Sequence, residues 1–203
     1  MAVTELAQLR LEPGASLQDP SLRAKLRKAT EAMEAFDGQP FHWYNQTEDP
    51  STFYIVGSWT SVRRHHQEWL PSAANQELLM LLSGHVLVDW MFHVDVAQDR
   101  LPLCAPVMVI TRHFVKPGAR WGLEAAIKSD KYHVANYTAP RNVAGGWRLD
   151  KGAEDQDEWV LFTGWPDVAE QTEFAETGDL KEYAKVREFS ASYEVKHATR
   201  MEL

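Results

Sequence analysis

The stretch Ile55-Val-Gly-Ser-Trp59-Thr-Ser-Val62 recurs in altered form as Leu161-Phe-Thr-Gly-Trp165-Pro-Asp-Val168. In both stretches an apolar run ends at a tryptophan. Because self-similarity at a fixed spacing is typical of internal duplication, the pair predicts that one structural unit occurs twice.

Further matches follow in the same order along the chain. Val3–Gly14 and Val107–Gly118 both end in a charged residue, a proline and a glycine, and Trp43 is matched by Trp147 and His93 by His197. We therefore expect a first unit at residues 1–96, a linker at 97–105, and a second, diverged unit at 106–203.

Local signals give the order of elements in the first unit. Asp19 and Pro20 are typical of a helix start and Gly38 of a helix end. The apolar residues between them recur at helical spacing; they are Leu22, Leu26, Ala29 and Met33. Strands are expected at 4–11, 41–46, 52–59 and 86–96, and a second helix between Ser61 and Gly84, interrupted near Pro71-Ser72.

The resulting order, βαββαβ, is that of a ferredoxin-like unit with both helices on one face of an antiparallel sheet. Such a unit leaves its other face bare, and exposed apolar surface is unfavourable by about 25 cal/mol per Å². The apolar residues that alternate along Val86–Val96 indicate such a face. We therefore predict an α+β fold of two tandem ferredoxin-like repeats, packed sheet to sheet as an intramolecular dimeric α+β barrel.

Composition excludes several classes of protein. The chain has 203 residues with 44% hydrophobic and 25% charged residues, a net charge of −8 and one cysteine. This acidic balance argues against a nucleic-acid partner, and no apolar stretch is long enough to cross a membrane. A single cysteine and the lack of a secretory signal favour a cytoplasmic location.

Several motifs resemble a known superfamily. The joint Gly57-Ser-Trp59-Thr-Ser61-Val62-x-x-His65, then Trp69, the Asn75-Gln76 helix and the strand that reaches His93 resemble antibiotic-biosynthesis-monooxygenase (ABM)-like proteins of the dimeric α+β barrel type, in a fungal tandem-repeat form. The resemblance implies a pocket between helices and sheet, and work on aromatic or polyketide-like metabolites, often without a cofactor. Gln171 stands near the position that corresponds to His65, so the second unit departs from the pattern.

His65 is the first candidate for catalysis, as a general base. On an α-helix it would share a face with Trp69, whose ring could stack on a substrate. Adjacent helical residues point about 100° apart, so at most one of His65 and His66 should face a pocket. The structural alternative for both is a helix N-terminal histidine at the solvent boundary.

The strand at 86–96 supplies further candidates. His93 is a possible catalytic residue, and Asp89 and Met91 share its face as candidate substrate contacts. Asp89 is too far along the strand to contact His93 directly, so an intermediate group would be needed. The alternative is a structural histidine, and the matching His197 favours a role in the fold.

The strand at 41–46 carries the remaining candidates. Asn45 could donate to an oxyanion as a third catalytic residue. His42, Trp43 and Tyr44 are candidate substrate contacts, although core packing is the alternative for Trp43 because Trp147 occupies the matching position.

No motif for a metal, a nucleotide phosphate or a Ser-His-Asp triad is present, so we expect no metal and no cofactor. The leading hypothesis is a cofactor-independent, monooxygenase-type tailoring enzyme for a small planar aromatic substrate, with a possible homodimer of tandem units. Alternatives are a non-oxidative decarboxylase, cyclase or dehydratase on a similar substrate, a non-catalytic ligand-binding barrel, and a haem protein with one histidine ligand.

Overall fold

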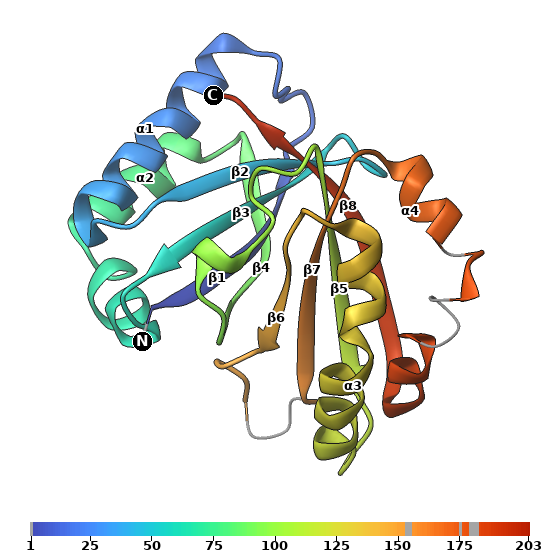
Figure 1. Ribbon diagram of the computed structural model, residues 1–203. Coiled ribbons are helices and arrows are strands. Elements are labelled where there is room, and N and C mark those ends of the chain that lie inside the picture. The colour runs from blue at the N-terminus through green and yellow to red at the C-terminus, as the bar shows by residue number, and fades with distance from the viewer. Residues whose placement is uncertain (1, 153–155, 175, 179–182) are drawn as a thin grey trace.

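The fold is built on a single antiparallel sheet (Figure 1). A computed structural model describes residues 2–152, 156–174, 176–178 and 183–203. The eight-stranded sheet has the order β4-β1-β3-β2-β8-β5-β7-β6. Its strands are β1 Val3–Leu11, β2 Phe41–Gln46, β3 Thr52–Trp59, β4 Val86–Val94, β5 Val107–Val115, β6 Val143–Trp147, β7 Glu158–Trp165 and β8 Ser190–Met201.

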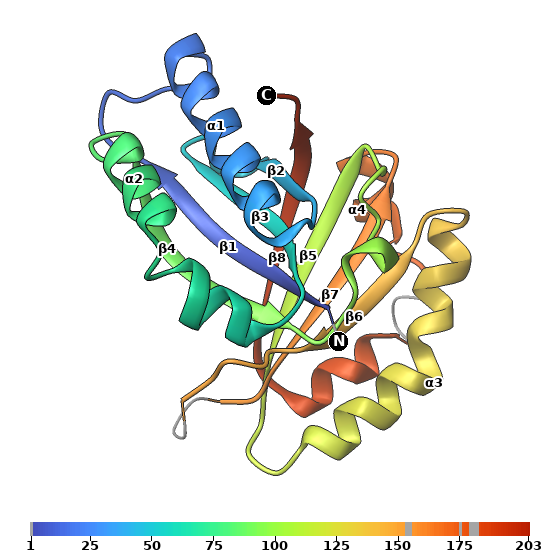
Figure 2. The ribbon, with the colours of Figure 1, turned by 90° about the vertical axis from the view of Figure 1, so that its left-hand side faces the viewer.

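The helices lie on two opposite flanks of the strands, with α1 and α2 on one and α3 on the other (Figure 2). The α-helices of the described residues are α1 Pro20–Asp37, α2 Ala73–Leu82, α3 Arg120–Thr138 and α4 Val168–Phe174. A π-helical turn spans Arg64–Trp69, and 3₁₀ turns span Gln98–Arg100 and Ala184–Phe189. The predicted α+β class is therefore confirmed.

We call β1–β4 with α1 and α2 the first half, and β5–β8 with α3 and α4 the second half. The strand order of the first half is β4-β1-β3-β2, and that of the second half is β8-β5-β7-β6. The halves are joined edge to edge, where Trp43–Gln46 of β2 pair with Ala198–Met201 of β8. The contact between the halves is therefore continuous hydrogen bonding as well as the face packing that the sequence predicted.

The two outer edges of the sheet also meet. Val94 of β4 and Arg148 form a β-bridge. On either side of it, the Asp95 amide donates to the Trp147 carbonyl at 3.0 Å and the Leu149 amide donates to the His93 carbonyl at 2.8 Å. The sheet thus curls until its ends touch, which leaves few free strand edges at this seam.

Curling encloses an apolar core between the inner faces of the two halves. Leu6, Val56 and Phe92 of the first half pack there with Met108 and Phe162 of the second half, and all are at most 1% exposed. Two further cores lie between sheet and helices, one in each half. Most of the sheet is thereby covered, either by helices or by the other half, whereas Leu87 and Val88 of β4 and Tyr193 of β8 stay exposed.

The signals for α1 were accurate. The Asp19 carboxylate accepts a hydrogen bond from the Ser21 amide, Pro20 is the first helical residue, and Gly38 ends the helix at φ +70°. The helix buries Leu22, Leu26, Ala29 and Met33, the predicted stripe. Ser72 caps α2 through the Asn75 amide at 3.1 Å, so the interruption at Pro71-Ser72 is also confirmed.

The predicted alternation along β4 was wrong at its centre. The pairing register of β1 and β4 shifts between Gln8 and Leu9, where Asp89 is the extra residue. A bulge of this kind reverses which face the following side chains occupy. Trp90 and Phe92 therefore face the core between the halves, whereas Val88 faces the helices.

The linker at 97–105 is a packed part of the barrel. Gln98 donates through Nε2 to the carbonyl oxygens of Pro40 and Val56, at 3.0 and 2.9 Å. Leu101 is buried in the core between the halves, and the Leu103 carbonyl accepts from the Tyr44 hydroxyl at 3.2 Å. The segment thus closes one end of that core.

Among the described helices, none is long and apolar enough to cross a membrane.

One buried histidine of the second half makes stability dependent on pH. His113 on β5 is fully buried, with Nδ1 at 3.2 Å from the Ser190 hydroxyl, and among the described residues its Nε2 has no hydrogen-bond partner. Burial, with a smaller contribution from the charge of Arg187, lowers the pKa of His113 to about 4. Between this value and the ordinary pKa of about 6.5, the unfolded chain binds more protons than the folded chain.

We expect the free energy of unfolding to fall as pH is lowered from 7.5 to 4.5, with His113 contributing about 2 kcal/mol of the fall. Urea unfolding at both pH values measures it. In His113→Phe the free energy of unfolding should fall by about 2 kcal/mol less over the same pH range. Any effect of the substitution that is equal at both pH values cancels in this comparison. An equal fall in both proteins would contradict the assignment.

Candidate functional site

A π-helical turn brings two adjacent histidines to a third. The Leu70 amide donates to the His65 carbonyl five residues earlier, at 2.9 Å. The wider turn lets both His65 and His66 approach His93, with ring centroids at 4.9 and 5.1 Å. Of the two adjacent histidines only His65 lines the apolar cavity described below, so the expectation that at most one of them faces a pocket is met. π-Turns within helices are frequent at functional sites.

A chain of hydrogen bonds runs from one half of the molecule to the other. Nδ1 of His65 lies 2.8 Å from Nε2 of His93, and Nδ1 of His93 lies 2.8 Å from the Asp150 carboxylate. The same carboxylate accepts from the His93 backbone amide at 2.7 Å. Asp150 follows β6 of the second half, whereas both histidines belong to the first half. The site therefore spans both.

This chain fixes the tautomers of its histidines. A carboxylate only accepts, so Nδ1 of His93 carries a proton and its Nε2 accepts. His65 must then donate from Nδ1, which leaves Nε2 as the nitrogen with a free lone pair. The arrangement presents His65 as an oriented base.

Asp89, the carboxylate that the sequence placed nearest to His93, lies elsewhere. Its carboxylate pairs with Arg10 at 3.1 Å and accepts from Gln8 at 3.2 Å. The bulge described above accounts for its displacement. Asp150 was missed because nothing local to β4 indicates a partner from the opposite half.

Trp59 and Glu5 complete the surroundings of His65. The indole ring of Trp59 stacks on the His65 ring, with centroids 4.2 Å apart and planes 6° apart. Its Nε1 donates to the Glu5 carboxylate, which lies 3.7 Å from Nδ1 of His65. Trp59 was noted in the sequence only as part of the repeated stretch and of the ABM-like motif, and Glu5 was not noted, although Glu5 is a charged residue within an otherwise apolar alternation.

Burial determines the charge of these groups. Burial first, and then the positive charges that His93 and His66 would carry, lower the pKa of His65 to about 3. Burial raises the pKa of Glu5, against the hydrogen bond from Trp59. Burial would also raise the pKa of Asp150, but the hydrogen bonds from His93 outweigh it and lower that pKa. Near neutral pH the site thus holds an uncharged His65 beside an ionised Asp150.

His65 lines an apolar cavity of about 170 Å³ between the sheet and the helices of the first half. Trp43, Trp69 and Met91 also line it, as expected. Asn75, which is buried and donates to the Leu70 carbonyl at 2.9 Å, is a polar lining residue that was not predicted as a site residue. Leu79 and Val88 line the cavity while remaining 51% and 57% exposed, so the cavity opens to solvent between α2 and β4.

Besides Asp89, and besides His66 and His93, which contact His65 without lining the cavity, three predicted site residues lie away from it. Asn45 lines a separate hollow beside the loop before α1, and its Oδ1 has no partner among the described residues. Tyr44 lies in the core between the halves, where burial raises its pKa to about 12. His42 lies in another surface hollow, with Nδ1 at 3.2 Å from the Arg200 guanidinium.

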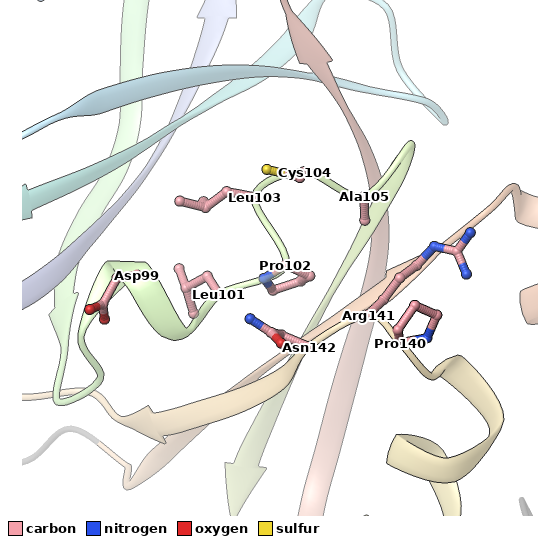
Figure 3. Close-up of a pocket in the computed structure, with 9 residues that line it drawn as sticks. All are labelled: Asp99, Leu101, Pro102, Leu103, Cys104, Ala105, Pro140, Arg141 and Asn142. Carbon is pink, nitrogen blue, oxygen red and sulfur yellow. The ribbon is translucent and has the colours of Figure 1, made fainter.

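A larger hollow of about 320 Å³ lies at the linker (Figure 3). Its lining carries no histidine, and Asp99 and Arg141 lie at opposite ends of it. The size of this hollow is therefore a poor guide to chemistry, and the His65 cavity is the candidate site.

The second half repeats part of the arrangement. His197 on β8 differs from His93 in the partner of its Nε2. That nitrogen lies 3.1 Å from the Gln171 side chain, where His93 has the imidazole of His65. Its Nδ1 lies 2.6 Å from the carboxylate of Glu48, which also accepts from the His197 amide at 3.0 Å. Each half thus supplies a carboxylate, Asp150 or Glu48, to the strand histidine of the other. The difference is the third residue, His65 in one and Gln171 in the other.

Haem does not fit the candidate cavity. A volume of about 170 Å³ matches a single aromatic ring, since an engineered cavity of about 150 Å³ holds benzene. A porphyrin contains four linked pyrrole rings.

The fold is similar to solved structures of low sequence identity. An anthrone oxidase-like protein matches with a TM-score of 0.67 and 9% identity over 98% of this chain and 92% of that chain. A candidate monooxygenase from Fusobacterium nucleatum matches with a TM-score of 0.65 and 12% identity over 99% and 93%. A heme-binding protein from Thermus thermophilus matches with a TM-score of 0.63 and 9% identity over 99% and 91%.

No protein-family model matches the sequence, and no curated protein matches it. The structural neighbours include monooxygenase-like and haem-binding proteins, so at these identities they establish the fold alone. The chemistry must be argued from the site.

The reciprocal carboxylates offer a matched pair of variants. His93 is fully buried, so Asp150→Ala would leave its Nδ1–H and amide without an acceptor, at a cost of about 2–3 kcal/mol in the free energy of unfolding. Glu48→Ala breaks the equivalent contacts of His197, but the Glu48 side chain is 36% exposed and water can replace it, so we expect about 1 kcal/mol or less. Urea unfolding at pH 7.5 compares the two. A larger loss for Glu48→Ala would refute this view of the site.

Proposed function

We propose that this chain is a monooxygenase-type enzyme that oxidises a planar aromatic substrate without a cofactor. The observation that carries the proposal is a neutral, buried imidazole, oriented by a hydrogen-bond chain, in the wall of an apolar cavity. His65 is the proposed catalytic base, and His93 and Asp150 position it.

The cavity supports a substrate of defined shape. Its volume accepts one aromatic ring, and its mouth between Leu79 and Val88 lets further rings extend toward solvent. Trp43 and Trp69 offer indole surfaces for the enclosed ring. We propose a phenol, a quinol or an anthrone-like molecule with its reactive ring inserted first.

The residues suggest how oxidation would begin. His65 would take a proton from an acidic O–H or C–H through Nε2. The resulting anion is electron-rich and delocalised, and it can react directly with O₂. One oxygen atom would enter the substrate and the other would leave as water, with the substrate supplying the electrons. Exclusion of water by the apolar walls would favour this reaction over reprotonation.

We further propose that residues 1–96 and 106–203 are two diverged copies of one unit and that only the first keeps a working site. The matching strand orders and the reciprocal pairs His93–Asp150 and His197–Glu48 support this. Gln171 has no titratable nitrogen, so it cannot serve as a base at the position that corresponds to His65.

The variant His65→Gln tests the proposal because it converts the first site into the likeness of the second. Small phenols and quinols should quench the fluorescence of the cavity tryptophans in His65→Gln as they do in the unmodified protein. We expect the Kd values of the two proteins to differ by less than about threefold. Oxygen uptake with the same compounds should fall by about 10²–10⁴-fold, the contribution typical of a general base. Gln171→Ala is the matched control and should retain uptake.

A second variant separates binding from proton transfer. Ala29→Leu places extra methyl groups in the cavity wall and should abolish both quenching and uptake while His65 remains intact. Undiminished uptake in His65→Gln would refute the base. Quenching without uptake of oxygen by any compound, in the unmodified protein, would favour a non-oxidative enzyme or a binding protein instead.

A further inference from the structure

We propose that His65, His66 and His93 form a binding site for one divalent first-row transition metal ion. A ring nitrogen of each histidine can be chosen so that all three lie within 4.8 Å of one another. This site was not expected from the sequence, because His65-His66 and His93 match no ligand spacing. It goes beyond the proposed function, which requires no metal.

The spacing of the three rings suits a common metal ion. With metal–nitrogen bonds of about 2.0–2.1 Å in a tetrahedral site, neighbouring ligand atoms lie about 3.3 Å apart. Nδ1 of His65 and Nε2 of His93 are now 2.8 Å apart, so small side-chain rotations would open them enough. The ring centroids of the three pairs lie at 4.9, 5.1 and 5.6 Å, a compact and nearly equilateral cluster.

Asp150 supplies the carboxylate partner that metal-binding histidines usually have. A ligating histidine usually donates its second ring N–H to a carboxylate, which fixes its orientation and raises its basicity. Asp150 accepts from Nδ1 of His93 at 2.8 Å and directs Nε2 of His93 toward His65. Asp150 also lies 3.3 Å from Nε2 of His66. Asp150 is therefore a positioning residue for the cluster.

The local charge favours a dication. Two carboxylates, Asp150 and Glu5, adjoin the cluster, and Glu5 lies 3.7 Å from Nδ1 of His65. Both could balance the charge of a bound ion. Imidazole nitrogens are among the commonest ligands of such ions in proteins.

The cluster also has an entry path and a vacant position. His66 has a side chain that is 38% exposed, whereas His65 and His93 are buried. An ion can arrive at His66 from solvent and be captured by the other two. Three protein ligands leave a fourth position for water or a ligand, the pattern of open rather than structural sites. Imidazole donors select zinc, copper, iron, cobalt or nickel over magnesium and calcium.

A bound metal ion and the His65–His93 hydrogen bond of the proposed function exclude each other. An ion on Nδ1 of His65 replaces the proton that His65 shares with His93, so a loaded site would not use the base described above. Metal binding measured without substrate therefore tests this inference alone. Oxygen uptake measured in the presence of a chelator tests the proposed function alone.

Cobalt is the probe for the experiment. The full-length chain, free of any histidine tag and stripped with a chelator, is titrated with Co²⁺ at pH 7.5. We expect one equivalent to bind with a Kd of about 1 µM or less, to develop visible d–d absorption, and to be displaced by Zn²⁺. Thermal unfolding with and without the ion reports the same binding through added stability.

His66→Leu is the decisive variant. His66 is exposed and touches the His65–His93–Asp150 chain only at the Asp150 carboxylate, which would keep both of its hydrogen bonds from His93. The fold and the chain should therefore survive the loss of His66. We expect Co²⁺ binding at least tenfold weaker. His85→Asn, at another histidine that is not part of the cluster, is the control and should bind as the unmodified protein does.

Two outcomes would overturn the site. The first is no absorption change and no metal-dependent stabilisation in the unmodified protein. The second is equal affinity in His66→Leu and in the unmodified protein, which would place the ion elsewhere. His93→Asn gives an independent check: if it folds, it should lose binding as His66→Leu does, and retention of full affinity would count against the proposal.

Discussion

Each half of the sheet has an apolar inner face that no helix covers, and the need to bury both faces governs the rest of the structure. The halves meet through Leu6, Phe92, Met108 and Phe162, all at most 1% exposed. Burying them aligns β2 with β8 and brings Val94 to Arg148. This closure brings Asp150, which follows β6, to the first half, so the hydrogen-bond chain at His93 is a consequence of apolar packing.

Much of the fold could be predicted from the sequence because the signals involved are local. The cap at Asp19, the stripe that ends at Met33 and the glycine at 38 act within α1 itself. The ABM-like resemblance and the order of elements pointed to the correct class. Four of the residues that the sequence offered as site candidates line one cavity; they are His65, Trp69, Trp43 and Met91.

The errors lie where periodicity is broken or where a contact is distant in sequence. The bulge at Asp89 reversed the faces of β4, and the π-turn lies where His65 and His66 both approach His93, a cluster that the sequence did not predict. Asp150 is far from His93 along the chain, and only the closed sheet brings them together. Asn45 follows the alternation of β2 correctly but lies too far along the strand to reach the cavity.

The crossed carboxylates have a consequence for how such a chain can change over time. A duplicated half that has lost its own base would ordinarily be free to accumulate substitutions. Here the loop after β6 must keep an acid that serves the opposite half, because His93 depends on Asp150. If the halves are the two diverged copies proposed above, selection for the first site would extend into the second half, and neither copy could be inherited, exchanged or discarded as an independent module.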